Sequence, residues 1–132
     1  MKSVLIVEDY EPFRQTIKDA FLSEIPDIQV LEAADGKTAL ELFNLTKPGV
    51  VLMDINIPPP SGFFALKRIK AASPDASMVV LTNHDTEEYR LAFLAHGADH
   101  FLSKRTSSIH EVVELVKSLT DGKESSSCAT SR

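Results

Sequence analysis

Five short apolar runs, rich in β-branched residues, alternate along the chain with segments whose apolar residues recur at helical spacing. In the first of these segments, for example, Phe13, Ile17 and Phe21 are spaced four residues apart. We expect a strand at each apolar run and a helix after it. The expected strands cover residues 3–7, 28–33, 49–54, 77–82 and 100–103.

The first, third and fourth of these runs are continuously apolar, which is typical of strands that are buried on both faces. Strands that alternate with helices form a parallel sheet with helices on both sides. The pattern therefore predicts a doubly wound α/β fold with a five-stranded parallel sheet, a three-layer sandwich. Helix boundaries are indicated at Pro26, Asp35-Gly36, Lys47-Pro48-Gly49 and Ser73-Pro74-Asp75.

Length and composition indicate one globular domain, since the chain has 132 residues and 43% apolar content. We expect the domain to cover residues 1–122 and residues 123–132, which are small and polar, to form a disordered tail. The net charge of -5 argues against non-specific contact with nucleic acid. A single cysteine, Cys128, excludes an intrachain disulfide, and the N-terminal apolar run is too short for a signal peptide or membrane span. These features predict a cytoplasmic protein that does not contact a membrane.

Polar side chains follow or end four of the expected strands. Glu8 and Asp9 follow the first strand, Asp54 closes the third, Thr82 ends the fourth and Lys104 follows the fifth. Ligands of open α/β sheets bind beyond the carboxyl ends of the strands, so we expect these side chains to converge. Three carboxylates together repel one another unless a cation lies among them, and their oxygens suit Mg²⁺. The pattern predicts a magnesium site in which the lysine neutralises the acids and holds a phosphoryl oxygen.

Each of these residues taken alone has a plainer interpretation. An aspartate at the end of a strand is often a turn or capping residue, and Glu8 and Asp9 could cap the first helix ahead of Pro12. Thr82 alone would be an ordinary strand residue. Only the whole set, placed at the ends of successive strands, favours a reactive site.

This set, in this order, resembles the receiver domain of two-component response regulators, and the resemblance covers residues 2 to about 121. It implies the strand order 2-1-3-4-5 of a flavodoxin-like fold. Pro58 and Gly62 match the loop signature of the family. The resemblance also implies a role for each site residue: Glu8 and Asp9 as the acidic metal pair, Asp54 as the phosphorylated aspartate and a metal ligand, the carbonyl of Asn56 as a further metal ligand, Thr82 as the switch hydroxyl, Phe101 as the switch aromatic and Lys104 as the phosphoryl-binding lysine.

The function implied is that of a signalling switch, which accepts a phosphoryl group on Asp54 from a histidine kinase or a histidine phosphotransfer protein, with Mg²⁺ as cofactor. A rival hypothesis is a Mg²⁺-dependent phosphatase with an aspartyl-phosphate intermediate, but such enzymes resemble DxD, and this chain has Asn56 at the second position. A binding module that has lost phosphorylation and a receiver excised from a longer DNA-binding response regulator are two further hypotheses.

Output is expected on the surface of the fourth helix, fifth strand and fifth helix, which the resemblance implies and which could also form a homodimer. In the fourth helix, helical spacing places Tyr89, Ala92, Phe93 and His96 on the face that packs on the sheet. Leu91 and Leu94 are then expected to be partly exposed, and Leu115 extends the patch. One departure from the family is Arg105, where receivers commonly have proline after the lysine; we expect a trans peptide bond there.

Overall fold

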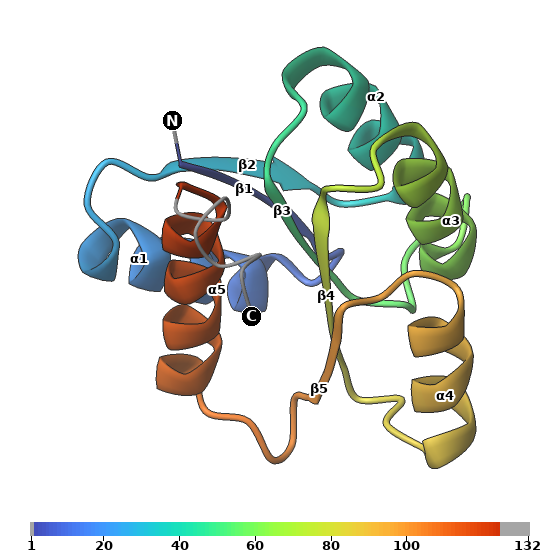
Figure 1. Cartoon of the computed structure of the whole chain (residues 1–132). Helices are drawn as coiled ribbons and strands as arrows, with labels where there is room; N and C mark the ends of the chain where they lie inside the picture. Colours follow the sequence, from blue (N-terminus) through green and yellow to red (C-terminus); the bar gives the residue numbers. More distant parts are fainter. Residues whose placement is uncertain (1, 125–132) are drawn as a thin grey trace.

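The computed structural model describes residues 2–124, and within them five strands alternate with five helices (Figure 1). Every expected strand is present, although the second and third are slightly shorter than predicted. The elements are β1 (Ser3–Val7), α1 (Glu11–Glu24), β2 (Gln29–Ala33), α2 (Gly36–Thr46), β3 (Val50–Met53), α3 (Gly62–Ala72), β4 (Ser77–Thr82), α4 (Glu87–Ala95), β5 (His100–Ser103) and α5 (Ile109–Glu124).

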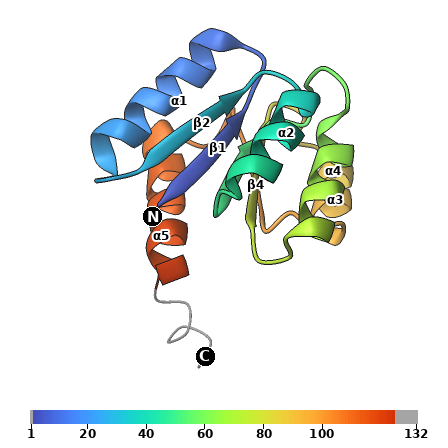
Figure 2. The same cartoon turned by 90° about the horizontal axis from the view of Figure 1, so that it is seen from above.

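The strands form one parallel sheet in the order β2-β1-β3-β4-β5, which confirms the predicted fold class and strand order. Helices α1 and α5 cover one face, and α2, α3 and α4 cover the other, as Figure 1 and Figure 2 both show. Successive side chains of β1 alternate between these layers: Val4 and Ile6 join the core with α1 and α5, whereas Leu5 and Val7 join the other core. The continuous apolar runs in the sequence therefore reflect burial on both faces of the sheet.

Helix ends follow the local chemistry that the sequence predicted. The carboxylate of Asp35 accepts a hydrogen bond of 2.7 Å from the backbone N–H of Thr38 and caps α2, and Lys47 ends that helix in the left-handed conformation. Helix α5 continues to Glu124 and does not end at the expected domain boundary of residue 122. The predicted disordered tail lies, apart from Lys123 and Glu124, outside the described residues. Within residues 2–124, no helix is long and apolar enough to cross a membrane.

The packing of α4 differs from the prediction. Phe93 is buried as expected, but Tyr89 and His96 are exposed and do not pack on the sheet. Tyr89 borders a cavity of about 400 Å³ between α4 and the start of α3, which Ala92 and Phe63 also line. His96 lies at the C-cap of α4, with its ring centroid 4.9 Å from that of Phe63. Of the residues on this predicted face, Phe93 reaches the core, whereas Tyr89 and His96 contact other side chains at the surface.

The three leucines of the expected output patch differ in exposure. Leu91 on α4 is 54% exposed. Leu94 is half-buried against the core under α2, α3 and α4, and Leu115 is half-buried against the core under α1 and α5. Of these three leucines, only Leu91 is therefore well exposed.

Candidate functional site

Backbone hydrogen bonds extend the sheet by one residue at three of the predicted site residues, Glu8, Asp54 and Lys104. The N–H of Glu8 donates to the carbonyl of Ala33 on β2 at 3.0 Å, and the N–H of Asp54 donates to Val7 on β1 at 3.0 Å. The N–H of Lys104 likewise donates to Thr82 on β4 at 2.9 Å. Because the sheet is parallel, these bonds hold the three polar residues at one edge.

The ammonium group of Lys104 lies at the centre of this edge. Its Nζ donates to Oε1 of Glu8 at 2.6 Å and to Oδ2 of Asp54 at 3.0 Å, and it lies 4.5 Å from the centroid of the Phe13 ring. The exposed fractions of the three charged side chains are 13% for Lys104, 5% for Glu8 and 10% for Asp54. One lysine from the end of β5 therefore joins carboxylates that follow β1 and β3.

Burial and ion pairing act in opposite directions on these groups. Burial raises the pKa of Glu8, and the hydrogen bonds from Lys104 and the Tyr10 N–H offset this rise only in part. Burial would lower the pKa of Lys104, but its hydrogen bonds to Glu8 and Asp54 prevail and raise that pKa. The lysine is thus held as a cation, and the carboxylates depend on it for compensation.

The loop after β3 presents Asp54 from a tightly packed backbone. Its Oδ1 accepts a hydrogen bond of 3.2 Å from the N–H of Asn56, whose own side chain is exposed. A Cβ at Gly62 would lie 2.7 Å from the Cα of Ile55 and 2.9 Å from the carbonyl oxygen of Asp54. Glycine at this position therefore allows α3 to begin directly against the backbone of Asp54.

Thr82 and Phe101 lie on neighbouring strands beside the acids. Thr82 is completely buried, and its hydroxyl accepts a hydrogen bond of 3.1 Å from the N–H of His84. Phe101 is half-buried, with its ring centroid 6.1 Å from that of Phe93 on α4. The structure thus connects the middle of β5 to α4 through the contact between Phe101 and Phe93, and the end of β4 to the following loop through Thr82.

The donor chemistry of the site suits Mg²⁺. Asp9 is exposed next to the buried Glu8, and carboxylate oxygens such as those of Asp9 and Asp54 are the hard ligands that this ion prefers. Among the described residues, no three acidic, histidine or cysteine side chains are gathered closely enough to hold a metal by themselves. Mg²⁺ usually takes only one or two carboxylates and keeps several waters, so Asp9, Asp54 and the carbonyl of Asn56 fit it. Capping of α1 by these acids is not found, because its N-cap is Tyr10 and lacks a side-chain hydrogen bond.

A second polar cluster joins the loops that follow β4 and β5, and the sequence did not indicate it. The hydroxyl of Ser103 donates to Asp85 at 2.6 Å, and Nη2 of Arg105 contacts both oxygens of the same carboxylate at 2.6 and 2.7 Å. The hydrogen bonds from Ser103 and Arg105 lower the pKa of Asp85. The peptide bond between Lys104 and Arg105 is trans as predicted, since the cis bond in the described residues is Pro59-Pro60. Arg105, in the loop that begins with Lys104 after β5, is thus tied to Asp85 in the loop after β4.

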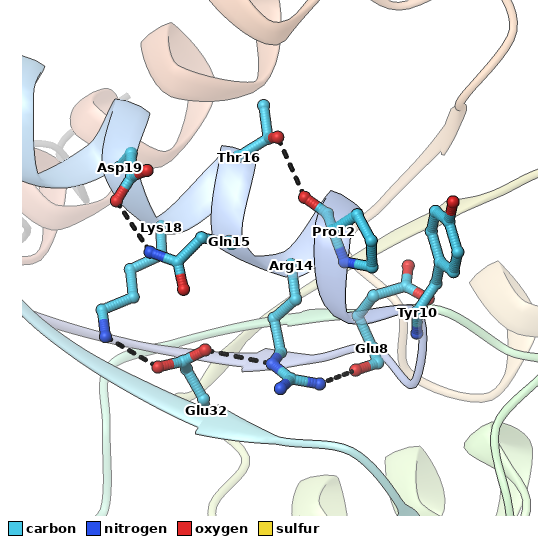
Figure 3. A network of polar contacts seen from close by, with 9 residues as sticks. All are labelled: Glu8, Tyr10, Pro12, Arg14, Gln15, Thr16, Lys18, Asp19 and Glu32. Carbon is cyan, nitrogen blue, oxygen red and sulfur yellow. Dashed lines mark hydrogen bonds and ion pairs between the residues drawn. The ribbon is translucent and has the colours of Figure 1, made fainter.

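A third polar cluster lies between α1 and β2, and Figure 3 shows it at close range. Arg14 and Lys18, one helical turn apart on α1, both donate to Glu32 of β2, at 3.0 and 2.8 Å. Hydrogen bonding to Lys18 and Arg14 lowers the pKa of Glu32 despite its partial burial. The spacing of the two cations is visible in the sequence, but their shared partner on a neighbouring strand is not.

Comparison with known proteins agrees with this geometry. A family model described as the response regulator receiver domain matches residues 4–117. The transcriptional regulatory protein DegU of Brevibacillus brevis is 33% identical over 120 residues, which are 90% of this chain and 50% of DegU. The receiver domain of the Francisella response regulator 1452 matches with a TM-score of 0.84 and 28% identity, over 93% of this chain and 99% of that one. A two-component response regulator of the LuxR family from Aurantimonas sp. SI85-9A1 has a TM-score of 0.82 and 26% identity, over 91% and 85% of the two chains.

The chain spans about half the length of the curated relatives it matches. The family model matches most of this chain, and the chain has the parallel sheet in the order 2-1-3-4-5. At one edge of this sheet, Lys104 contacts Glu8 and Asp54. The chain therefore belongs to the family of response regulator receiver domains, which are signalling domains of two-component systems.

Proposed function

We propose that this chain accepts a phosphoryl group on Asp54 from a phosphohistidine of a histidine kinase or a histidine phosphotransfer protein. One observation carries the proposal: the ammonium of Lys104 bridges Asp54 and Glu8 at the carboxyl edge of the sheet, at 3.0 and 2.6 Å. This arrangement supplies a carboxylate nucleophile and, beside it, a cation for the oxygens of an incoming phosphoryl group.

In the transfer step, an oxygen of the Asp54 carboxylate attacks phosphorus while the P–N bond of the donor breaks. The electron pair of that bond leaves with the imidazole nitrogen, and the product is an acyl phosphate on Asp54. Lys104 then exchanges a carboxylate oxygen for a phosphoryl oxygen, and the hydroxyl of Thr82 moves to donate to another. Attack by water on phosphorus later releases inorganic phosphate and restores the carboxylate. The protein contributes mainly position and electrostatics.

Receiver domains use Mg²⁺ for phosphorylation, and we propose that Asp9, Asp54 and the carbonyl of Asn56 hold it here, with Glu8 acting through a bound water. When bound, Mg²⁺ neutralises negative charge on the phosphoryl oxygens during transfer. The exposed position of Asp9 supports a direct role for it, whereas Glu8 is already bonded to Lys104 and to the Tyr10 N–H.

Removal of the metal is expected to stop phosphorylation of the wild-type chain by a small phosphodonor such as acetyl phosphate. Asp9→Ala should weaken Mg²⁺ binding about 10- to 100-fold and Glu8→Ala less, because a ligand contributes more than a residue that acts through water. Phosphate incorporation with and without EDTA, and Mg²⁺ titration by calorimetry, measure the two effects. Glu24→Ala, at the exposed end of α1, is the matched control. Phosphorylation of both site variants at the wild-type rate would contradict the metal assignment.

The phosphatase hypothesis has no support in the site. Its general acid would stand at Asn56, which has an exposed amide side chain. We therefore propose a phosphate-accepting domain and not an enzyme that turns over a separate substrate. Curated relatives about twice as long are named transcriptional regulatory proteins. This supports the prediction that another part of a longer protein carries a DNA-binding output. The absence of nucleic-acid contact by this chain and its cytoplasmic location also remain predictions.

We propose that output follows from a shift of α4. Phosphate on Asp54 draws Thr82 toward it, Phe101 occupies the space that Thr82 leaves, and α4 adjusts because Phe93 contacts Phe101. The surface of α4, β5 and α5 then fits a partner or a second copy of the chain. Phosphorylation acts as a shift between two populations, limited by the difference in phosphoryl affinity between them.

Leu91→Glu is expected to weaken association of the activated chain, whether with a second copy or with a partner. A carboxylate at this exposed α4 position would lose its hydration when the surface is covered. Leu91 is preferable to Leu94 and Leu115 for this test, because both of those side chains pack against the core. Sedimentation with BeF₃⁻ and Mg²⁺ measures the association, and Leu45→Glu, on the exposed side of α2, is the control. Equal association of wild type and Leu91→Glu would exclude this surface.

A further inference from the structure

The acidic loop, defined as residues 8–10 between β1 and α1, is attached to its surroundings mainly through Glu8. The N–H of Glu8 donates to Ala33 on β2 at 3.0 Å, and its carboxylate accepts from Lys104 and from the Tyr10 N–H at 2.6 and 3.1 Å. These contacts place the start of the loop and its first carboxylate. Of the two backbone groups of Glu8, they leave the carbonyl, which directly precedes Asp9, to be held by another residue.

Arg14 holds that carbonyl. Its Nη1 donates to the backbone oxygen of Glu8 at 2.7 Å, while its Nε donates to Oε1 of Glu32 at 3.0 Å (Figure 3). The side chain is 15% exposed, so these contacts are made in a largely buried setting. A guanidinium group is planar and presents donors in fixed directions, so it can bridge two acceptors that lie on different elements.

Glu32 fixes the orientation of this guanidinium group. It belongs to β2, where it is paired in register with Ile6 of β1, and its other oxygen accepts from Lys18 at 2.8 Å. The sheet fixes the backbone of Glu32, and the bonds from Lys18 and Arg14 restrain the carboxylate of this side chain, which is 28% exposed. The position of β2 is therefore transmitted through Glu32 and Arg14 to the peptide group between Glu8 and Asp9.

We propose that Arg14 is a positioning residue for the acidic loop: anchored by Glu32, it fixes the Glu8–Asp9 peptide group so that the Asp9 carboxylate is directed to the metal position beside Asp54. The inference rests on the proposed function, since it concerns the same metal site. Arg14 touches neither the phosphoryl group nor the metal, and it acts through the backbone of Glu8. Residues that orient metal ligands in this way commonly change metal affinity 10- to 100-fold when they are replaced.

Three variants of the full chain test the proposal in the unphosphorylated state. Arg14→Ala should raise the dissociation constant for Mg²⁺ about tenfold and speed hydrogen exchange at the Tyr10 amide, whose bond to the Glu8 carboxylate reports the order of the loop. Arg14→Lys keeps the charge but cannot bridge both acceptors, so it should restore only part of the affinity. Gln15→Ala, which removes an exposed pair with Asp19 on the same helix, should change neither quantity.

The outcomes separate this inference from the proposed function. Wild-type Mg²⁺ affinity and wild-type Tyr10 exchange in Arg14→Ala would overturn the positioning role, and so would complete rescue by lysine, which would assign the effect to charge alone. If Arg14→Ala does not fold, Arg14→Lys and Glu32→Gln decide by the same two measurements. If the wild-type chain binds no Mg²⁺, the proposed function fails, and the Tyr10 exchange rate still decides whether Arg14 orders the loop.

Discussion

Replacement of Asp54 by asparagine is expected to abolish phosphorylation of this chain by small phosphodonors and by a partner kinase. An amide oxygen is too weak a nucleophile to form the acyl phosphate, whereas the shape of the side chain is unchanged. Its oxygen can still accept from the N–H of Asn56, and Lys104 keeps Glu8 as a partner. The fold is therefore expected to survive while the chemistry is lost.

Intact-protein mass spectrometry after treatment with acetyl phosphate and Mg²⁺ measures the loss, and reductive trapping of the acyl phosphate before peptide mapping locates it. Asp75→Asn replaces an exposed aspartate beyond α3 and should be phosphorylated like the wild type. Incorporation of phosphate into Asp54→Asn at the wild-type level, or mapping of the acyl phosphate to another residue, would refute the assignment.

Lys104→Met is expected to cost about 3 kcal/mol of unfolding free energy at neutral pH when no divalent cation is present. Removal of one partner from a buried ion pair leaves an uncompensated charge, and here two carboxylates, Glu8 and Asp54, lose the same cation. Methionine preserves the length and the apolar stem of the side chain beside Phe13, so the loss reports mainly on charge. Chemical denaturation in EDTA measures it.

The effect is expected to shrink as the pH falls. The pKa of Glu8 is already raised in the folded chain by burial, above an ordinary value near 4.5, and loss of the Lys104 hydrogen bond raises it further. A carboxyl group with a raised folded pKa stabilises the fold below its unfolded pKa and loses that contribution as the pH rises through the folded pKa. Protonation of Glu8 at acidic pH therefore relieves the variant.

Lys37→Met is the matched control for this experiment. Lys37 is exposed on α2 and pairs with Glu41 at 3.6 Å, so its loss should cost less than about 0.5 kcal/mol at any pH. A Lys104→Met chain as stable as the wild type at pH 7.5, or equally destabilised at pH 5 and pH 7.5, would show that the carboxylates do not depend on this lysine.

The fold could be predicted from the sequence because each step was local. Apolar runs marked the strands, helical spacing marked the helices, and Asp35 and Lys47 marked the ends of α2. The carboxyl ends of parallel strands must meet at one edge, so the gathering of Glu8, Asp54 and Lys104 also followed from the order of elements.

Predictions about α4 were less successful because helical spacing defines a face but not how closely that face is covered. The spacing grouped Tyr89 and His96 with Phe93, yet only Phe93 is buried among these three. The cavity between α4 and the start of α3 depends on the path of the loop after β3, which the periodicity of α4 does not contain.

The sequence by itself determined the layers of this protein, the edge of the sheet that carries the chemistry and the residue at the end of each strand there. Only the tertiary structure decided the partners of the residues around this edge: Arg14 with Glu32 and the carbonyl of Glu8, and Arg105 with Asp85. The physical reason is the separation, along the sequence, of the residues that interact. Strand and helix formation depends on residues close in sequence, whereas an ion pair depends on where two separate elements place their side chains, to within a few ångströms.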